Sequence, residues 1–171
     1  MPDPQREELA RFIATCAQVA PNFRWTPGEN LHLTLRFIGS VERVLAETIA
    51  DALADQPLAS VQLQLGGIGT FGRPRAARVV WLGLNAGAEA AGALAAQVDA
   101  ECVRAGLSRE ERAFQAHMTL ARARSRDGSR LPELAATPRL DPWLAAELVL
   151  YSSRLTKTGA VYETLRTLPL R

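Results

Sequence analysis

The sequence contains only two histidines, and each begins a four-residue phrase that almost repeats the other. The first phrase is His32-Leu33-Thr34-Leu35, and the second is His117-Met118-Thr119-Leu120. Polar and apolar residues alternate in both phrases, as they do in a half-buried β-strand. Side chains two residues apart on a strand lie on the same face. Each phrase therefore predicts a strand that buries its apolar side chains and presents a His and a Thr on its other face.

A His and a Thr on one strand face have a chemical use when the pair occurs twice. Imidazole gains and loses a proton near neutral pH, so one histidine can act as a general base while the other acts as a general acid. A threonine hydroxyl can donate a hydrogen bond to an anionic oxygen. Two such strands side by side predict a site that transfers a phosphoryl group to water or to a hydroxyl without a metal ion. Single histidines in strands are more often structural, but the recurrence of Thr at the same offset favours the catalytic interpretation.

Length and composition are those of a globular protein. The chain has 171 residues, which suits one compact domain or two small lobes that share a core, and its formal net charge is +2. Lys157 is the only lysine, so almost all positive charge is arginine, which binds phosphate in a bidentate manner; GC-rich coding would produce the same excess. No apolar segment is long enough to cross a membrane, and the N-terminus has no signal-peptide pattern. We therefore expect a cytoplasmic protein.

The two cysteines give no sign of a metal or redox site. Cys16 and Cys102 lie in helical apolar patterns, with no CxxC spacing and no histidine nearby. We expect both to be buried free thiols. Two histidines without a Cys or carboxylate partner are a weak metal-binding set, so we predict no metal and no cofactor.

Hydrophobic periodicity predicts the secondary structure. Helical spacing occurs over residues 3–19, 41–54 and 88–105, and one further helical turn is expected at 131–135. Strands are expected at residues 32–38, 58–65, 79–84, in the second histidine phrase, and at 146–155 and 161–168, the last two joined as a hairpin. Pro and Gly favour loops over residues 22–30 and 66–75. The order of these elements predicts an α+β fold of two related lobes around a shared cleft.

Longer segments around the two phrases resemble a known family. His32-Leu33-Thr34-Leu35-Arg36-Phe37-Ile38-Gly39 and Phe114-Gln115-Ala116-His117-Met118-Thr119-Leu120-Ala121-Arg122 are similar to the paired signatures of the two-histidine phosphoesterase superfamily. Within it, the chain most resembles the RNA 2′,3′-cyclic phosphodiesterases, also called the 2′-5′ RNA ligase family. Supporting phrases lie at residues 69–71, 80–83 and 148–155. The resemblance extends over nearly the whole chain from Trp25 onward.

The resemblance implies a fold and a reaction. The fold is bilobal, with two antiparallel sheets lining a central cleft, helices outside, and pseudo-twofold halves, all within one domain of residues 1–171. The reaction is hydrolysis of a 2′,3′-cyclic phosphate at an RNA 3′ end to a 2′-phosphomonoester, with weak ATP-independent 2′-5′ ligation in reverse. His117 is assigned as base and His32 as acid, although the sequence leaves this direction open. Thr34 and Thr119 hold the non-bridging oxygens. The expected partner is an RNA end, and the expected state is a monomer without a nucleotide cofactor.

Arg122 matches the phosphate-binding arginine of the family, but its position raises a geometric condition. It lies an odd number of residues after His117, so a regular strand would direct the two side chains to opposite faces. A β-bulge, or the end of the strand, must redirect Arg122 if it binds the phosphate.

Other side chains are weaker candidates for substrate binding. Arg36 shares the alternation face of His32, so it reaches either the phosphate or the rim of the site. Phe37 and Trp25 are candidates for stacking on a base, with a core position as the alternative. Tyr151 is a candidate for a hydrogen bond near the site. The arginine-rich loop at residues 122–130 either contacts the RNA backbone or is simply solvated.

The chain also departs from the family pattern. Members of the family usually begin with a short apolar strand, whereas this chain begins with Pro2-Asp3-Pro4-Gln5, so either that strand is not part of the sequence given or the lobe lacks one strand. The residues also leave three alternative functions open. The first is a related phosphoesterase that acts on a cyclic nucleotide, an ADP-ribose cyclic phosphate or a 2′-5′ oligoadenylate. The second is a non-catalytic module that binds RNA ends. The third, with the histidines as metal ligands, is the weakest.

Overall fold

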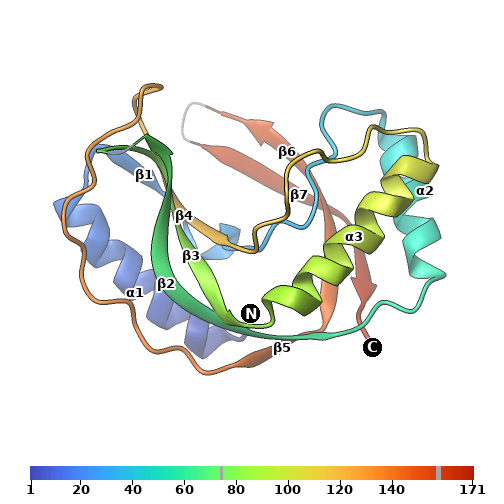
Figure 1. Cartoon of the computed structure of the whole chain (residues 1–171), viewed down its shortest axis with the longest axis horizontal. Coiled ribbons are helices and arrows are strands. Elements are labelled where there is room, and N and C mark those ends of the chain that lie inside the picture. Colours follow the sequence, from blue (N-terminus) through green and yellow to red (C-terminus); the bar gives the residue numbers. More distant parts are fainter. Residues whose placement is uncertain (74, 157–158) are drawn as a thin grey trace. The chain divides into compact units, whose positions relative to one another are not determined.

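The computed structural model describes residues 1–73, 75–156 and 159–171 (Figure 1). The elements follow the chain in the order α1, β1, a short 3-10 helix η1, α2, β2, β3, α3, β4, β5, β6 and β7. They form an α+β fold with a five-stranded and a two-stranded sheet, which confirms the predicted fold class. The chain divides into two compact units. Unit 1 comprises residues 1–33, 63–86 and 117–143, and unit 2 comprises residues 34–62, 87–116 and 144–171.

Unit 1 is built on the five-stranded sheet, which has the strand order β1-β4-β3-β2-β5. The pairs β1–β4, β4–β3 and β3–β2 are antiparallel. The strand bounds are Phe23–Trp25 for β1, Val61–Arg73 for β2, Ala76–Ala86 for β3, Met118–Ala123 for β4 and Trp143–Ala145 for β5. Strand β4 therefore has β1 on one side and β3 on the other.

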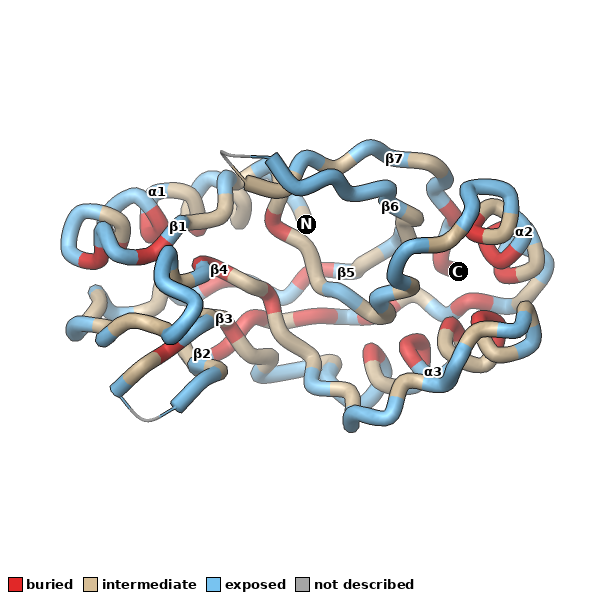
Figure 2. The backbone as a smooth tube through the Cα atoms, turned by 90° about the horizontal axis from the view of Figure 1, so that it is seen from above, coloured by how far each residue is buried: buried red, intermediate tan, exposed pale blue. Residues whose placement is uncertain are grey.

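A hydrophobic core covers one face of this sheet. Helix α1 (Asp3–Val19) confirms the helix expected at residues 3–19, and it buries one face that includes Phe12 and Cys16. On the sheet, Val80 and Leu82 of β3 alternate with the less buried Trp81. The buried residues of α1, β3 and β4 appear red in Figure 2. The side chains that alternate with them, including Trp81, lie on the opposite face of the sheet.

Strand β2 is longer than predicted. The sequence predicted a strand at 58–65 and a glycine-rich loop at 66–75, but β2 continues through these glycines to Arg73. Gly69 is paired with Trp81 of β3, and a Cβ built on Gly69 would lie 2.2 Å from atoms of the indole ring. The glycine therefore makes room for a neighbouring side chain rather than ending the strand.

The segment after His32 is not the strand that its alternation predicts. Within residues 31–38 only Leu33 forms a ladder pair, an isolated antiparallel bridge to Met118 of β4. The edge of β4 is shared, because β1 pairs with residues 121–123 and the amide of Thr26 donates to the carbonyl oxygen of Leu120 at 2.8 Å. Little of this edge remains for a second strand, so the segment forms no further ladder pair beyond Leu33, and the chain bends at Leu35.

Unit 2 contains two helices and a β-hairpin. Helices α2 (Arg43–Ala54) and α3 (Ala88–Arg104) confirm the two predicted helices. Strands β6 (Glu147–Leu155) and β7 (Ala160–Pro169) confirm the predicted hairpin, although Lys157 and Thr158 of its turn lie outside the described residues. Helix α2 packs against β7 and α3.

Several smaller predictions are wrong or incomplete. Residues 131–135 form no helical turn, and Leu131 and Leu134 lie in a segment without regular secondary structure that packs on the core of unit 1. Within the predicted loop at 22–30, β1 is a short strand and η1 (Gly28–Asn30) is a turn of 3-10 helix. Among the described residues no strand precedes α1. None of the described helices has the length and apolar character needed to cross a membrane.

Both cysteines are buried and unpaired in the described structure, as predicted. Cys16 lies on the core face of α1, and Cys102 lies on that of α3. Burial raises the pKa of both thiols, because the thiolate would lose its hydration in the core. The α3 helix ends beside Cys102, where the amide of Leu107 donates to the Cys102 carbonyl oxygen and Gly106 adopts a φ of 92°.

Candidate active site

The bridge between Leu33 and Met118 places the two histidines on one face of the sheet of unit 1. In an antiparallel pair the neighbours of a bridge are also opposed, so His32 lies opposite Thr119. His117 is two residues before Thr119 and is therefore the diagonal neighbour of His32. Such diagonal neighbours are separated by about 7–8 Å. Leu33 and Met118 point away from this face, and Met118 is 3% exposed.

One ring nitrogen of His32 is engaged by the backbone. Its Nδ1 lies 2.7 Å from the carbonyl oxygen of Asn30, at the end of η1. A carbonyl oxygen only accepts hydrogen bonds, so Nδ1 carries a hydrogen and Nε2 is the nitrogen available for proton transfer. Arg6 of α1 donates to the carbonyl oxygen of Gly28 at 3.0 Å and ties η1 to the helix. The orientation of His32 is therefore fixed by its own chain segment.

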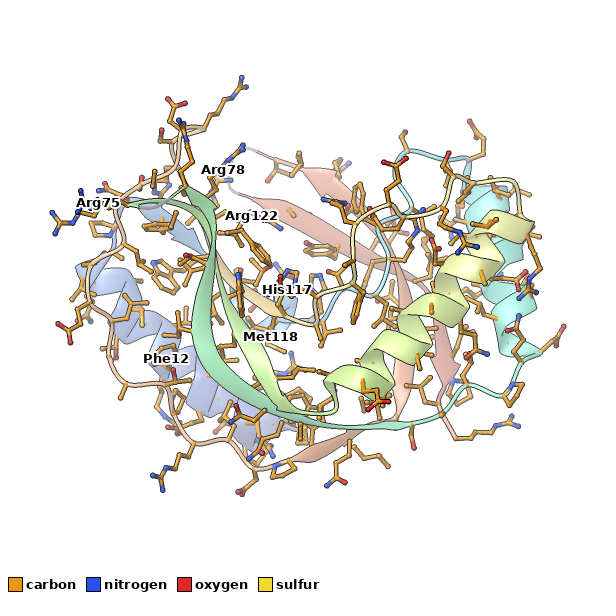
Figure 3. All side chains as sticks on the ribbon, in the orientation of Figure 1. Phe12, Arg75, Arg78, His117, Met118 and Arg122 are labelled. Carbon is orange, nitrogen blue, oxygen red and sulfur yellow. The ribbon has the colours of Figure 1, made fainter. Side chains whose placement is uncertain are left out.

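Two aromatic rings flank His117. The ring centroid of Phe71 lies 5.0 Å from that of His117 in an edge-to-face arrangement, and that of Trp81 lies 6.1 Å away. Phe71 and Trp81 also contact each other, with centroids 5.2 Å apart. Figure 3 labels His117 together with Met118 and Arg122 of β4. Phe71 and Trp81 were not predicted as neighbours of a histidine. Their alternation in β2 and β3 was the available signal, but it needs the strand register.

A β-bulge in β4 brings Arg122 to the histidine face. Trp81 is paired with Thr119, whereas the next residue of β3, Val80, is paired with Ala121, so Leu120 is an extra residue. The bulge shifts the alternation by one position. Beyond it, Arg122 is paired with Val79, which lies two residues from Trp81 and shares its face. This confirms the bulge that the odd spacing between His117 and Arg122 required.

The strand register arranges this face in two rows. The first row runs from His32 through Thr119 and Trp81 to Gly69. The second row runs from Arg24 through Arg122 and Val79 to Phe71. Arg24 was not predicted as a site residue, because its position beside Arg122 depends on the pairing of β1 with β4. The face therefore combines two imidazoles, one hydroxyl and two guanidinium groups.

Arg36 is engaged in a different way in unit 2. Its Nε lies 3.0 Å from Oδ1 of Asp99, and its Nη1 lies 3.1 Å from Oε2 of Glu110. Its Nη2 also donates to the carbonyl oxygen of Ser108 at 2.5 Å. The side chain is 11% exposed. Two carboxylates thus neutralise Arg36, and neither the predicted phosphate contact nor a position on an open rim fits this environment.

The neighbourhood of Arg36 also perturbs Glu110. Hydrogen bonds from the side chain and backbone of Arg112 are the main reason that the pKa of Glu110 is lowered to about 2, and the charge of Arg36 adds a smaller contribution. Glu110 therefore remains ionised at all pH values near neutrality.

The other predicted residues of unit 2 are accessible. Thr34 is exposed, and Phe37 is 68% exposed. Tyr151 of β6 is 42% exposed and packs edge to face against Tyr162 of β7, with ring centroids 5.7 Å apart. These side chains are open to a ligand.

Trp25 is not placed to stack on a base. It is paired with Ala121, which is 0% exposed, and its ring packs on the core that contains Phe23 and Val80. Its Nε1 donates to the carbonyl oxygen of Ala20 at 3.1 Å. The core alternative is therefore correct for Trp25.

No group of three His, Cys, Asp or Glu side chains within residues 1–73, 75–156 and 159–171 is arranged to hold a metal ion. Besides the indole N–H of Trp81, the strand register places two imidazoles, the Thr119 hydroxyl and two guanidinium groups on the histidine face of unit 1. These groups exchange protons and bind anions.

Comparison with known families matches both halves of the chain. The model of the family described as LigT-like phosphoesterase matches residues 1–81 and, a second time, residues 82–162. Each match contains one histidine phrase. This duplication agrees with the two related halves expected from the sequence.

Individual relatives show the same similarity. An RNA 2′,3′-cyclic phosphodiesterase of Aeropyrum pernix is 34% identical over 92% of this chain and 92% of its own length. One of Geobacillus stearothermophilus is 31% identical over 96% of this chain, which spans 53% of that longer protein. The crystal structure of E. coli LigT complexed with 3′-AMP matches with a TM-score of 0.79 and 26% identity, covering 99% of this chain and 93% of that one.

Proposed function

The chain belongs to the LigT-like phosphoesterase family, and from this premise we propose that it hydrolyses 2′,3′-cyclic phosphate ends of RNA to 2′-phosphomonoesters. The main support for the proposal is the bridge between Leu33 and Met118, which makes His32 the diagonal neighbour of His117. A separation of about 7–8 Å leaves room for a phosphate between the two rings. Relatives named for this reaction are similar over nearly the whole chain.

The proposed mechanism uses one histidine on each side of the phosphorus atom. His117 accepts a proton from a water molecule, and the water oxygen forms a bond to phosphorus opposite the ribose O3′. The bond from phosphorus to O3′ breaks, and O3′ takes a proton from Nε2 of His32. The phosphate remains on O2′. His117 has then gained a proton from water and His32 has given one to O3′, and exchange with solvent restores both rings.

The remaining polar groups stabilise the developing negative charge. The hydroxyls of Thr34 and Thr119 donate hydrogen bonds to the non-bridging oxygens, and Arg122 pairs with the same anion. The exposed Phe37 and Tyr151 are the proposed contacts to the base. Trp25 and Arg36 are not part of the site, since the core holds the first and two carboxylates hold the second.

The same site joins RNA ends weakly when a ribose hydroxyl replaces the attacking water. Water is far more concentrated than RNA ends, so hydrolysis dominates. The reaction needs neither a nucleotide cofactor nor a metal ion. We also propose that the protein acts as a monomer in the cytoplasm and that its two units form one catalytic domain over residues 1–171.

An oligonucleotide that ends in a 2′,3′-cyclic phosphate tests this proposal. We expect conversion to the 2′-phosphate in the presence of EDTA, resolved from the 3′-phosphate by chromatography. Replacement of His32 or His117 by Ala is expected to lower kcat by about 10²–10⁴-fold. Replacement of the exposed Arg109 by Ala is the control and leaves kcat unchanged.

Three results would contradict the proposal. Persistence of the cyclic end rules out the substrate, and activity that disappears only on chelation rules out metal-free catalysis. Unchanged turnover in both histidine variants rules out the paired acid and base. A panel containing cyclic nucleotides, ADP-ribose cyclic phosphate and 2′-5′ oligoadenylate tests whether another phosphoester is preferred.

A further inference from the structure

A second concentration of positive charge lies at the end of the β2–β3 hairpin, apart from the histidines. A cavity of about 420 Å³ opens there in unit 1. Its lining combines three arginines with four uncharged residues, and it contains no Asp or Glu. The lining residues are Thr70, Gly72, Arg73, Arg75, Ala77, Arg130 and Leu131.

These three arginines lack the partners that Arg36 has. Arg73, Arg75 and Arg130 are exposed, and no carboxylate in the described parts of the chain forms an ion pair with any of them. Three guanidinium groups around one cavity repel one another unless an anion lies between them. The arrangement therefore favours a polyanionic ligand.

The backbone holds these charges together although they come from distant segments. Ser129 forms an antiparallel bridge with Ala77, and its amide donates to the Ala77 carbonyl oxygen at 2.9 Å. Gly128 just before it has a φ of 89°, and a Cβ there would lie 2.4 Å from the carbonyl oxygen of Ala76. Only glycine allows the loop to approach so closely, and this contact brings Arg130 to the hairpin.

Arg75 is held in an unusual conformation at the same place. Its φ of 63° makes it the one described non-glycine residue with a positive φ. Side chains other than Gly, Asn and Asp are uncommon in this region, because the Cβ atom crowds the backbone. The hairpin thus keeps an arginine where a glycine or asparagine would relieve strain.

Along the strands the cavity lies one ladder pair beyond the second row of the histidine face, but on the other face of the sheet, because Thr70 is paired with the buried Val80 and Ala77 belongs to the same core cluster as Val80. Phe71 and Val79 end the row that contains Arg122, and the next ladder pair beyond them is Gly72 with Ala77, two lining residues of the cavity. Each strand residue advances the chain by about 3.3 Å, so the cavity begins within about 7 Å of that row. Figure 3 shows Arg78 and Arg122 on one side of the end of the β2–β3 hairpin and Arg75 on the other.

We propose that Arg73, Arg75 and Arg130 bind backbone phosphates of the RNA strand upstream of its reacting 3′ end. Guanidinium groups pair with phosphate oxygens in a bidentate manner, and contacts to the backbone carry no sequence preference. Arg122 holds the terminal phosphate, and an RNA strand that passes around the end of the hairpin places its upstream phosphates on the hairpin arginines. The nature of the ligand rests on the proposed function. The site makes the enzyme favour long RNA over short fragments.

A triple variant, Arg73→Gln, Arg75→Asn and Arg130→Gln, removes this charge, and Asn tolerates the positive φ at position 75. A second triple variant, Arg11→Gln, Arg109→Gln and Arg139→Gln, removes the same number of exposed charges elsewhere. Both variants change the formal net charge from +2 to −1. Thermal melting followed by circular dichroism checks that both are folded.

The binding measurement requires no turnover. The ligand is a single-stranded RNA of eight nucleotides with a 3′-hydroxyl end, and its affinity is measured by fluorescence anisotropy at several salt concentrations. We expect the hairpin variant to lower the slope of log K against log salt by about 2, since each phosphate contact on a single strand contributes about 0.7. The control variant is expected to keep the slope of the unmodified protein. Equal changes in both variants would overturn the proposal.

The kinetic measurement compares a dinucleotide and an octanucleotide, each with a 2′,3′-cyclic phosphate end. In the hairpin variant we expect kcat/KM to fall at least tenfold for the octanucleotide, through KM, and to stay within twofold for the dinucleotide. Equal losses on both substrates would contradict a separate backbone site. If the unmodified protein hydrolyses neither substrate, the proposed function fails, and the anisotropy result still decides whether the hairpin binds RNA.

Discussion

Arg122 in unit 1 and Arg36 in unit 2 follow the two histidine phrases at almost the same distance, yet their surroundings differ. Arg36 is 11% exposed and is neutralised by Asp99 and Glu110. Arg122 is exposed on the face that carries the histidines, and no carboxylate in the described structure pairs with it. Similar sequence positions thus hold one arginine that stabilises the fold and one that is available to an anion.

The difference shows what sequence alternation reveals and what it omits. Alternation in the first phrase placed Arg36 beside His32, and alternation in the second directed Arg122 away from His117. The structure reverses both expectations. The segment after Leu33 does not continue as a strand, and a bulge at Leu120 shifts the alternation of β4. Replacing each arginine separately tests this division of roles.

The largest effect is expected at Arg122. Replacing it by Ala should lower kcat/KM for a cyclic phosphate end by about 10²-fold, because a charge-assisted contact to the reacting anion is lost. Thermal stability should not change, since the side chain is exposed. Arg122→Lys should recover part of the activity, because Lys keeps the charge but not the bidentate geometry. A loss of stability with normal kinetics would show that Arg122 is structural.

Arg36 should show the opposite pattern. Replacing it by Ala leaves Asp99 and Glu110 without their shared cation and is expected to lower the free energy of unfolding by about 2–4 kcal/mol. Urea denaturation measures this change. The folded enzyme should keep kcat/KM within about threefold, since Arg36 does not contact the substrate. A large loss of kcat/KM at unchanged stability would restore Arg36 as a phosphate ligand.

Substitution of Gly69 tests whether the packing of Trp81 against His117 matters for activity. Gly69→Ala places a methyl group where the indole of Trp81 lies, so the ring must move, at a cost of about 1–3 kcal/mol. We expect activity to fall as well, because Trp81 packs against His117. Gly67→Ala on the same strand is the matched control, since a Cβ there meets nothing within 4 Å. Equal stability and equal activity of the two variants would show that the indole of Trp81 can move without a cost.

The smallest effect concerns pH. The folded-state pKa of Glu110 is lowered to about 2, from an ordinary value of 4.5. Its ion pairs are therefore fully present above the ordinary value and are lost as pH falls toward 2. Glu110→Gln should flatten the dependence of the melting temperature on pH between 4.5 and 2. Superimposable curves for the two proteins would mean that these ion pairs contribute nothing to stability.

Local patterns predicted much of the fold. Helices α1, α2 and α3 and the β6–β7 hairpin agree with their periodicity, because each buries one regular face against its own unit. The strand after His32 was wrong, because β1 already occupies much of the β4 edge, and the sequence does not show which segment takes an edge. The glycines of β2 were interpreted as a loop, although Gly69 is small to accommodate Trp81.

The candidate site, too, was predicted only in part from the sequence. Alternation predicted His32, His117 and the two threonines as candidates, and the strand register places His32, His117 and Thr119 on one face. Phe71, Trp81 and Arg24 were missed as site residues because they reach the histidine face through the register of three strand pairs. Trp25 lies in a mostly polar segment, but its pairing with Ala121 turns the ring to the core.

Because of the bulge at Leu120, the number of residues between His117 and Arg122 decides which face of β4 the arginine occupies. With one extra residue in β4, the histidine and the arginine share a face only when their sequence numbers differ by an odd count, as those of His117 and Arg122 do. A deletion that leaves the bulge in place would turn the guanidinium toward the core, whereas deletion of Leu120 itself would remove the bulge and keep both side chains on one face at an even spacing. The odd spacing and the bulge are therefore a single feature, and a change in the length of this segment preserves the site only when the bulge is gained or lost with it.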